Sequence, residues 1–263
     1  MKKKKWIPLC ILALIGCVVS GVYIVYYINN QRMAERVYEE AREKESEPEA
    51  TETPVPTEKT ETPTAQPTEK PVDIPVDFAA LKEQNDEIYA WIRVPGTAVD
   101  YPVVQSRTDD SFYIHRGINK ENLYAGAIYT EMANARDFSD PNTVLYGHNM
   151  KDGSMFASLH NFRDRDFFDS NREILIYTPE HILHYTIFAA YTYDNRHLLN
   201  SFDFHDPQVF QEYLDQVYDV RSMDAYFADQ PKVTAKDKII TLSTCIGSSS
   251  SRYLVQGVLT ETE

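Results

Sequence analysis

A cysteine ends one apolar run of the sequence, and an arginine opens the next. Cys245 follows residues 238–244, which have the composition of a buried strand, and Arg252 precedes a similar run at residues 253–260. If these two runs pair as a hairpin, the guanidinium lies near the thiol. A cation beside a thiol favours the nucleophilic thiolate, and a guanidinium can also hold an oxyanion. The pattern therefore predicts Cys245 as a nucleophile with Arg252 as its partner.

One histidine is placed to carry protons for such a nucleophile. His148 follows an apolar run at residues 143–147, and Gly147 gives the backbone freedom just before it. A thiol that cleaves an amide needs a group that protonates the departing amine, and histidine does this near neutral pH. The other histidines are weaker candidates. Four of them fall in polar loop or helix surroundings, where a solvated side chain is expected, namely His115, His160, His197 and His205, and His181 and His184 fall in a hairpin.

The cysteine count indicates a free thiol. Cys10 and Cys17 lie in an apolar N-terminal segment, so Cys245 is the only cysteine in the rest of the chain and has no partner for an internal disulfide. The sequence contains no H-E-x-x-H motif and no cysteine pair at metal-binding spacing, which argues against a zinc site. We expect no metal and no cofactor.

Short apolar runs separated by turn residues dominate the chain after Asp77, and we expect a strand at each of them. Two helices should interrupt these strands, one near residues 154–161 and one at residues 207–220, whose apolar residues share a face. Asp77 suits the N-cap of a first helix, which would carry Trp91 and end at Pro95. Many strands with few helices favour a mixed barrel covered by helices. The expected strands are residues 99–105, 127–130, 143–147, 174–178, 181–193, 238–244 and 253–260.

The N-terminal part is expected to anchor the protein. Residues 1–5 are basic, and residues 6–28 form an uncharged, largely apolar run that is long enough for one transmembrane helix. Residues 29–76 are expected to form a stalk. Its first part, residues 31–47, is rich in Glu, Arg and Ala and should extend the membrane helix or form a short charged helix, whereas residues 48–75 are rich in Pro, Thr and Glu and should be disordered. Residues 77–263 would form the folded domain, outside the cell because the basic tail stays in the cytoplasm. A cleaved signal peptide and a lipoprotein signal at Cys17 are the alternatives for the apolar run.

The charge of the chain excludes one class of partner. With 26 basic and 40 acidic residues the net charge is −14, and four of the lysines lie together at residues 2–5. Phosphate contacts need clustered basic side chains, so nucleic-acid binding is set aside.

Taken together, the candidate catalytic residues resemble the signature of the sortase family of cysteine transpeptidases. The resemblance lies in residues 241–245, Thr-Leu-Ser-Thr-Cys, and in Arg252 at the start of the next strand. It also lies in His148, which precedes Cys245 by 97 residues. The matching features extend over essentially the whole expected domain.

Within that family the chain is most similar to class B, through residues 145–148, Leu-Tyr-Gly-His, through residues 100–105, and through a helix between late strands. The resemblance implies a mainly β fold, a closed mixed barrel of about eight strands with an N-terminal helix and an inserted helix. The loop between Cys245 and Arg252 has six residues and is shorter than is usual in class B, so the substrate preference does not carry over. The implied substrate-binding residues are Ser243, Thr244, Tyr101 and Val104.

The resemblance also implies a transpeptidation that needs no cofactor. Cys245 would attack a threonine carbonyl in the C-terminal sorting signal of a secreted protein, while Arg252 would steady the oxyanion or position the peptide. His148 would protonate the leaving amine and then take a proton from the acceptor. That acceptor would be an amine of a lipid-linked cell-wall precursor or of a pilin, met at the outer face of the membrane.

Two other functions stay open on the residues alone. One is an exported papain-like cysteine peptidase, although in that class the cysteine precedes the histidine, whereas here His148 precedes Cys245. The other is a stalked binding module without activity, in which Cys245 is an inert core thiol. Trapping of a thioester by an amine distinguishes a transpeptidase from a peptidase.

Overall fold

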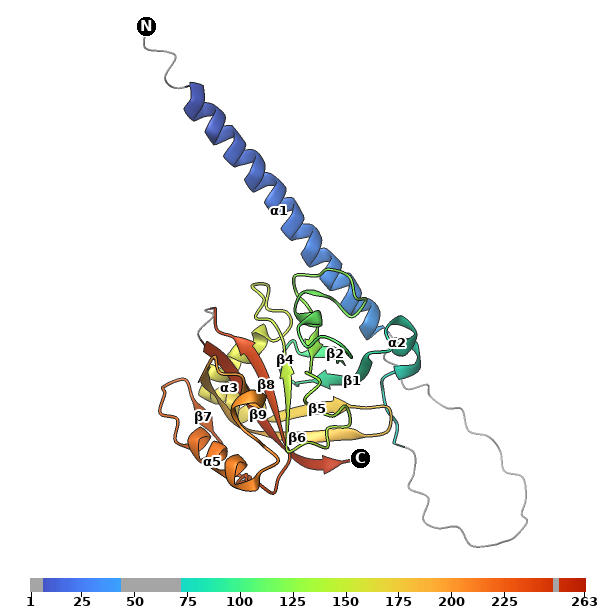
Figure 1. Cartoon of the computed structure of the whole chain (residues 1–263), viewed down its shortest axis with the longest axis vertical. Helices are drawn as coiled ribbons and strands as arrows, with labels where there is room; N and C mark the ends of the chain where they lie inside the picture. The colour runs from blue at the N-terminus through green and yellow to red at the C-terminus, as the bar shows by residue number, and fades with distance from the viewer. Residues whose placement is uncertain (1–6, 44–71, 248–250) are drawn as a thin grey trace, which may run out of the picture.

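The computed structural model describes residues 7–43, 72–247 and 251–263. The expected basic tail at residues 1–5 and most of the expected stalk at residues 29–76 lie outside the described residues. Figure 1 shows a long N-terminal helix that projects from a β-rich domain.

Eight strands of the described chain close into a mixed barrel, as expected. They are β1 (Ile88–Arg93), β2 (Asp100–Val104), β3 (Ile128–Tyr129), β4 (Asn142–Tyr146), β5 (Glu173–Tyr177), β6 (Ile182–Asp194), β8 (Ile239–Cys245) and β9 (Ser251–Thr262). Their order is β5-β1-β2-β3-β4-β8-β9-β6, and pairing of β6 with β5 closes the ring. The pairs β2–β3 and β4–β8 are parallel, and the other neighbours are antiparallel. A two-residue strand, β7 (Tyr226–Phe227), pairs with β6 outside this ring.

The late strands bury both of their faces. Along β9, Tyr253 and Val255 belong to one core cluster, whereas the intervening Leu254 packs in a second cluster with Phe210 of α5 (Pro207–Tyr218). This helix, expected at residues 207–220, covers the outside of the barrel. Strands that are covered on both faces need apolar residues on each face, so the sequences of these strands are continuous apolar runs.

The first helix of the domain is shorter than expected. α2 (Phe78–Gln84) begins after the predicted N-cap Asp77, but its C-cap Asn85 is extended and leads the chain into β1. Trp91, expected on this helix, therefore lies on a strand. β1 is buried on both faces and paired with both β2 and β5, so its sequence lacks the alternation that would have distinguished a strand from a helix.

The other helices of the domain are short. The helix expected near residues 154–161 is a 3₁₀ helix, η3 (Ala157–Arg163), followed by α3 (Arg165–Ser170). A second 3₁₀ helix, η2 (Phe112–His115), lies between β2 and β3, and α4 (Leu198–Ser201) follows β6.

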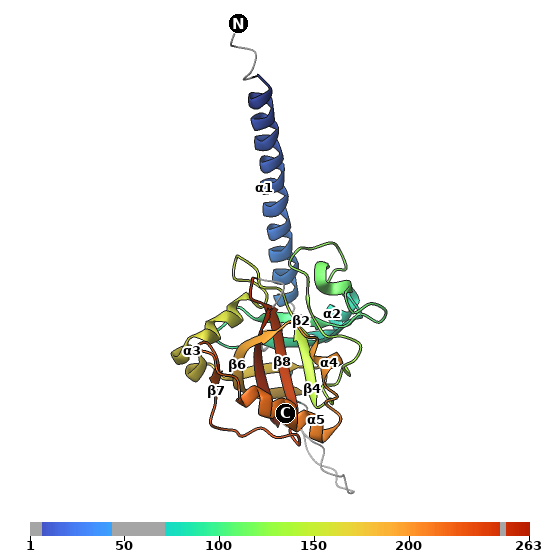
Figure 2. The same cartoon turned by 60° about the vertical axis from the view of Figure 1, so that its left-hand side comes forward.

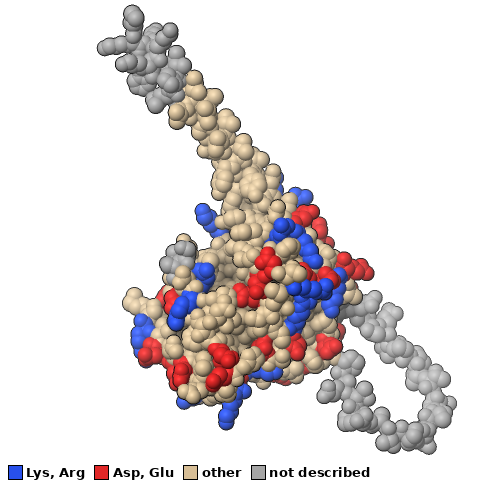
Figure 3. Space-filling view, in the orientation of Figure 1, with Lys and Arg blue, Asp and Glu red and all other residues tan. Residues whose placement is uncertain are grey.

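The N-terminal helix α1 (Ile7–Arg42) is continuous over 36 residues, and part of it is long and apolar enough to cross a membrane. Its outer part carries no charged side chains, whereas charges gather where it meets the domain (Figure 3). There, Val37, Tyr38 and Ala41 are buried in the same core cluster as the barrel. The helix thus continues beyond the apolar run into the charged first part of the stalk, which is one of the two arrangements expected there.

A buried amide joins β8 and β9 in the middle of their pairing. Gln256 on β9 is fully buried and donates to the hydroxyls of Thr241 on β8 and Tyr213 on α5, each at 2.8 Å. Its oxygen accepts from Tyr191 on β6 at 3.2 Å. One side chain therefore fixes the register of the two strands against two further elements.

We expect Gln256→Ala to lower the free energy of unfolding by about 2–4 kcal/mol, because it leaves a cavity and removes hydrogen bonds from buried hydroxyl groups. Denaturant titration followed by circular dichroism measures this difference. The control is Gln208→Ala on the exposed side of α5, for which we expect a change below about 0.5 kcal/mol. Equal unfolding midpoints for the two variants would show that the amide does not stabilise the fold.

Candidate active site

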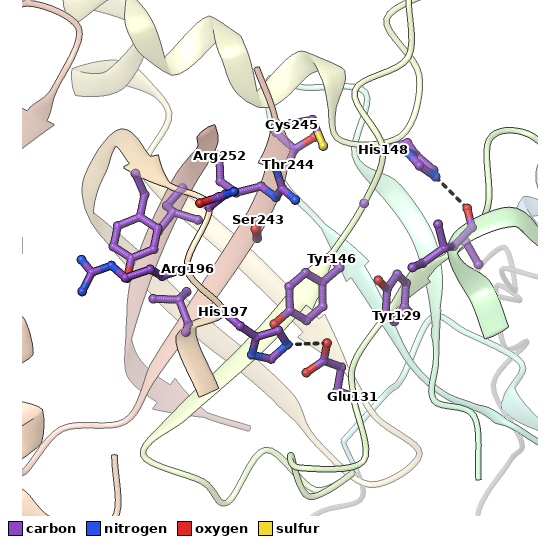
Figure 4. A pocket seen from close by; sticks show the side chains of 17 residues that line it. Tyr129, Glu131, Tyr146, His148, Arg196, His197, Ser243, Thr244, Cys245 and Arg252 are labelled. Carbon is purple, nitrogen blue, oxygen red and sulfur yellow. Dashed lines mark hydrogen bonds and ion pairs between the residues drawn. The ribbon is translucent and has the colours of Figure 1, made fainter. Parts of the chain in front are cut away.

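The expected hairpin brings the cysteine and the arginine together. β8 and β9 are antiparallel, and Cys245 and Arg252 are the last pair of their register. Directly opposed residues on neighbouring strands have Cβ atoms about 4.5–5.5 Å apart and point to the same face. The guanidinium of Arg252 therefore lies beside the thiol of Cys245, as Figure 4 shows.

The histidine reaches the same edge of the barrel because β4 is parallel to β8. Tyr146 at the end of β4 pairs with Ser243, and the next backbone N–H, that of Gly147, donates to the Ser243 carbonyl at 3.1 Å. His148 follows directly. Gly147 has no room for a side chain, since a Cβ there would lie 2.6 Å from both Ile128 and Phe156. This close approach accounts for the glycine before the histidine.

A cavity of about 300 Å³ opens at this edge of the barrel (Figure 4). Its lining includes the three predicted catalytic residues, Cys245, His148 and Arg252, and it also includes Ser243 and Thr244. Further lining residues were not predicted from the sequence, because they come from loops and from strand ends far apart in the chain: Tyr129, Glu131, Tyr146, Tyr193, Arg196 and His197.

The imidazole of His148 is held in one orientation. Its Nε2 lies 2.6 Å from the carbonyl oxygen of Ile114, and because a carbonyl only accepts, Nε2 carries the proton. In the neutral ring Nδ1 then has the free lone pair. The ring is also nearly parallel to those of His115 and Tyr124, with centroids 5.5 and 6.3 Å away.

Burial lowers the pKa of His148 below its ordinary value. The Ile114 carbonyl opposes this shift by accepting from the ring, and the neighbouring His115 adds to it. The ring therefore favours its neutral form, in which Nδ1 can take a proton from an amine.

The backbone at Cys245 is tied to two other elements. Its carbonyl oxygen accepts from Asn149 Nδ2 at 2.8 Å and lies 3.1 Å from Nε2 of His160 on η3. The sequence placed His160 among solvated histidines. That expectation was wrong, because the ring is half-buried against Tyr253 and burial lowers its pKa.

The guanidinium of Arg252 is available for an anion. Within the described part of the chain it makes no ion pair, and its one hydrogen bond goes to the Ser251 carbonyl at 3.2 Å. A cation without a carboxylate at the mouth of a cavity keeps its charge for the thiolate or for a developing oxyanion.

The opposite wall of the cavity is polar. His197 Nε2 lies 2.8 Å from a carboxylate oxygen of Glu131, whose pKa is raised by burial and lowered in part by this contact. Among the described residues, the buried hydroxyls of Tyr146, Tyr193 and Thr244 have no hydrogen-bond partner. The hydroxyls of Tyr146 and Tyr193 therefore have unused hydrogen-bonding capacity next to the cavity.

Two residues expected to bind substrate lie outside this cavity. Val104 is fully buried in the barrel core. Tyr101 is buried beneath α1, where its hydroxyl accepts from the backbone N–H of Met155 at 3.0 Å and Arg42 lies over its ring. The structure therefore brings Ser243 and Thr244 to the catalytic residues but not Tyr101 and Val104.

No metal-binding group emerges from the described residues, since none of their His, Cys, Asp and Glu side chains form a cluster of three or more.

Comparisons with known proteins identify the family of the domain. The model of the sortase domain family matches residues 92–260. Sortase B of Listeria monocytogenes is 34% identical over 182 residues, which make up 68% of this chain and 72% of the relative. Sortase B of Staphylococcus aureus is 29% identical over 168 residues, or 64% of this chain and 67% of the relative.

Solved structures show the same fold. The crystal structure of sortase B from B. anthracis in complex with AAEK1 has a TM-score of 0.69 and 30% identity, and covers 91% of this chain and 99% of that chain. The structure of Clostridium perfringens sortase B has a TM-score of 0.63 and 29% identity, over 70% of this chain and all of that chain.

We expect His148 to titrate below the ordinary histidine pKa of about 6.5, which NMR of the imidazole resonances measures. His115→Ala should raise the pKa of His148, because it removes a neighbouring positive charge and admits water. The exposed His205, replaced by alanine, should leave it unchanged. Since the unfolded chain protonates this ring at higher pH, its contribution to stability should fall as pH drops through about 6.5. A His148 pKa at or above 6.5 would contradict the buried, neutral ring.

Proposed function

The chain belongs to the sortase family of cysteine transpeptidases, in class B, and we propose that Cys245, His148 and Arg252 carry out its reaction. The observation that supports this assignment is the meeting of the three side chains at one cavity, each from a strand end or the residues next to it.

In the first half of the proposed reaction, the thiolate of Cys245 attacks a peptide carbonyl carbon of the sorting signal. The new S–C bond converts the carbonyl oxygen to an oxyanion, which the guanidinium of Arg252 holds. Collapse of this intermediate breaks the C–N bond, and protonated His148 gives a proton to the departing amine. The acyl part of the substrate remains on Cys245 as a thioester.

In the second half, an acceptor amine attacks the thioester. Neutral His148 takes a proton from this amine, and the free lone pair on Nδ1 suits the task because Nε2 already donates to Ile114. The C–S bond breaks, the thiolate of Cys245 returns, and an amide joins the two substrates. No oxidant, metal or cofactor enters this balance.

The size of the cavity limits the substrate. About 300 Å³ admits a few residues of an extended peptide but not a folded domain. The threonine of a C-terminal sorting signal on a secreted protein fits this requirement. Beside Cys245, Ser243 and Thr244 line the cavity.

We place the reaction at the outer face of a membrane. Residues 7–28 of the uncharged run lie within α1, and the basic residues 2–5 that precede the run favour a cytoplasmic N-terminus. The domain would then meet both secreted proteins and an amine acceptor, which is a lipid-linked cell-wall precursor or a pilin.

We expect Cys245→Ala to abolish acyl transfer while the unfolding midpoint stays near that of the wild type. Cys245→Ser should be nearly inactive, because an alcohol is far less ionised than a thiol. The assay incubates the protein with a library of sorting-type peptides and oligoglycine or diaminopimelate amines, and identifies products by mass.

Three outcomes of this assay are informative. Amine adducts from the wild type support a transpeptidase. Hydrolysis without adducts favours an exported peptidase. Transfer by Cys245→Ala at a substantial rate would overturn the assignment of the nucleophile.

Arg252→Ala should lower turnover by about 100-fold or more, as loss of an oxyanion donor does in other enzymes. Arg252→Lys should recover part of this loss, because an ammonium lacks the planar two-pronged geometry of a guanidinium. The control is Arg221→Ala on the exposed surface, for which we expect unchanged turnover. Steady-state transfer measures the turnover of each variant, and thermal melts check that each variant is folded. Near-normal turnover of Arg252→Ala would leave Cys245 and His148 in place but require another oxyanion donor.

A further inference from the structure

The last three turns of α1 form part of the catalytic domain. We call residues 30–42 the bracket segment. Within it, Val37, Tyr38 and Ala41 are buried in the barrel's core cluster. The hydroxyl of Tyr38 donates to the carbonyl of Gly126. This packing makes the helix an element of the fold and not only an attachment to it.

Polar contacts extend this packing along the helix. At one end of the bracket segment, Asn30 accepts from the backbone N–H of Tyr124 at 2.8 Å, and Gln31 donates to Asp152 at 3.0 Å. At the other end, Arg42 Nε donates to a backbone carbonyl of β2 at 3.2 Å. These contacts span about 18 Å of helix, so they fix its direction as well as its position.

The chain that follows the bracket segment returns to the same domain. Arg42 bonds β2, and after residues 44–71, which lie outside the described residues, Ile74 and Val76 pack against the same core. Both ends of the proline-rich segment are therefore attached to one body. Its length cannot set the distance between α1 and the domain, as a spacer would.

The loops that α1 contacts are those beside the catalytic histidine. Tyr124 stacks on the ring of His148, and Asn149 bonds the carbonyl of Cys245. A second cavity, of about 350 Å³, lies between α1 and these loops. Figures 1 and 2 show β4 and β8 running toward the side of the domain from which α1 leaves.

The lining of this second cavity suits a molecule held at a membrane surface. It includes Tyr23, Tyr26 and Tyr27 at the end of the apolar run, together with Tyr124 and Lys151. Tyrosines gather where a transmembrane helix leaves the hydrocarbon, because one end of the ring is apolar and the other is polar. The same lining holds one ammonium, that of Lys151, and one carboxylate, that of Asp152, to which Gln31 donates.

We propose that the bracket segment holds the His148 side of the catalytic cavity against the membrane, so that a lipid-linked amine acceptor reaches His148 through the second cavity. This inference rests on the proposed function, in which α1 crosses the membrane and the acceptor is an amine. In this arrangement the domain is not held on a flexible stalk, and its active site has a fixed height above the bilayer. A fixed height raises the effective concentration of an acceptor confined to the same surface.

The test separates the membrane span from the bracket segment. A flexible Gly/Ser segment of about ten residues is inserted after Ile28 in the full chain, which is then reconstituted in vesicles. The matched control carries the same insertion after Glu58, between the two attached ends. Transfer is measured to a vesicle lipid whose headgroup bears an oligoglycine amine and, separately, to soluble oligoglycine.

We expect the insertion after Ile28 to lower transfer to the lipid amine about tenfold or more, and to leave transfer to the soluble amine within about twofold. The insertion after Glu58 should change neither rate. The proposal would be overturned if transfer to the lipid amine stayed unchanged after the insertion at Ile28. It would also be overturned if the insertion at Glu58 lowered that transfer equally. Absence of transfer by the wild type to either amine would instead refute the proposed function.

A second measurement tests whether the bracket segment is docked on the domain, and it does not depend on enzymatic activity. In vesicles, Gln31→Cys with Asp152→Cys should be joined rapidly by a short bismaleimide, in a background where Cys10, Cys17 and Cys245 are replaced. Gln31→Cys with a cysteine at the exposed Asp215 of α5 should not be joined, because α5 lies at the far end of the domain (Figure 2). Equal cross-linking of the two pairs would show that α1 is not docked.

Discussion

The antiparallel register of β8 and β9 is the constraint on which the active site depends. The pairing runs from Ile239 with Val258 to Cys245 with Arg252, so every inner pair determines which residues meet at the end. A slip of one residue would turn one strand's side chains to the opposite face. Gln256 opposes such a slip, because its amide has partners on three other elements. Buried contacts thus position the reactive pair, and the loop between them does not have to.

In the proposed reaction, two side chains at the edge of the barrel have separate electrostatic roles. A thiolate needs a lasting positive charge, and Arg252 provides it because a guanidinium does not titrate near neutral pH. Proton transfer needs a group that exists in both forms, and His148 is one, although burial lowers its pKa and favours the neutral ring. If the imidazolium had to supply the charge as well, that same burial would work against catalysis. The guanidinium of Arg252, which makes no ion pair with the described residues, removes this conflict.

The sequence was sufficient to predict the barrel, the inserted helix and the positions of Cys245, His148 and Arg252, because each residue adjoins the end of an apolar run whose pairing partner is also apolar. It was not sufficient for contacts that depend on loops far apart in the chain. The pair of Glu131 and His197 joins positions 66 residues apart, and no local pattern marks it. The strand β1 was misread as helix because it is buried on both faces, so its spacing carries no period of two.

Composition is also an incomplete guide to where the folded domain begins. Charge and proline content divide the chain near residue 76, and on that basis the folded unit is residues 77–263. Packing divides it differently, since the buried faces of Val37, Tyr38 and Ala41 come from the charged helix before the proline-rich segment. Three small or aromatic side chains in an otherwise polar stretch are too few to register as a hydrophobic face. They nevertheless complete the core beneath β2, and so they connect the direction of α1 to the placement of His148.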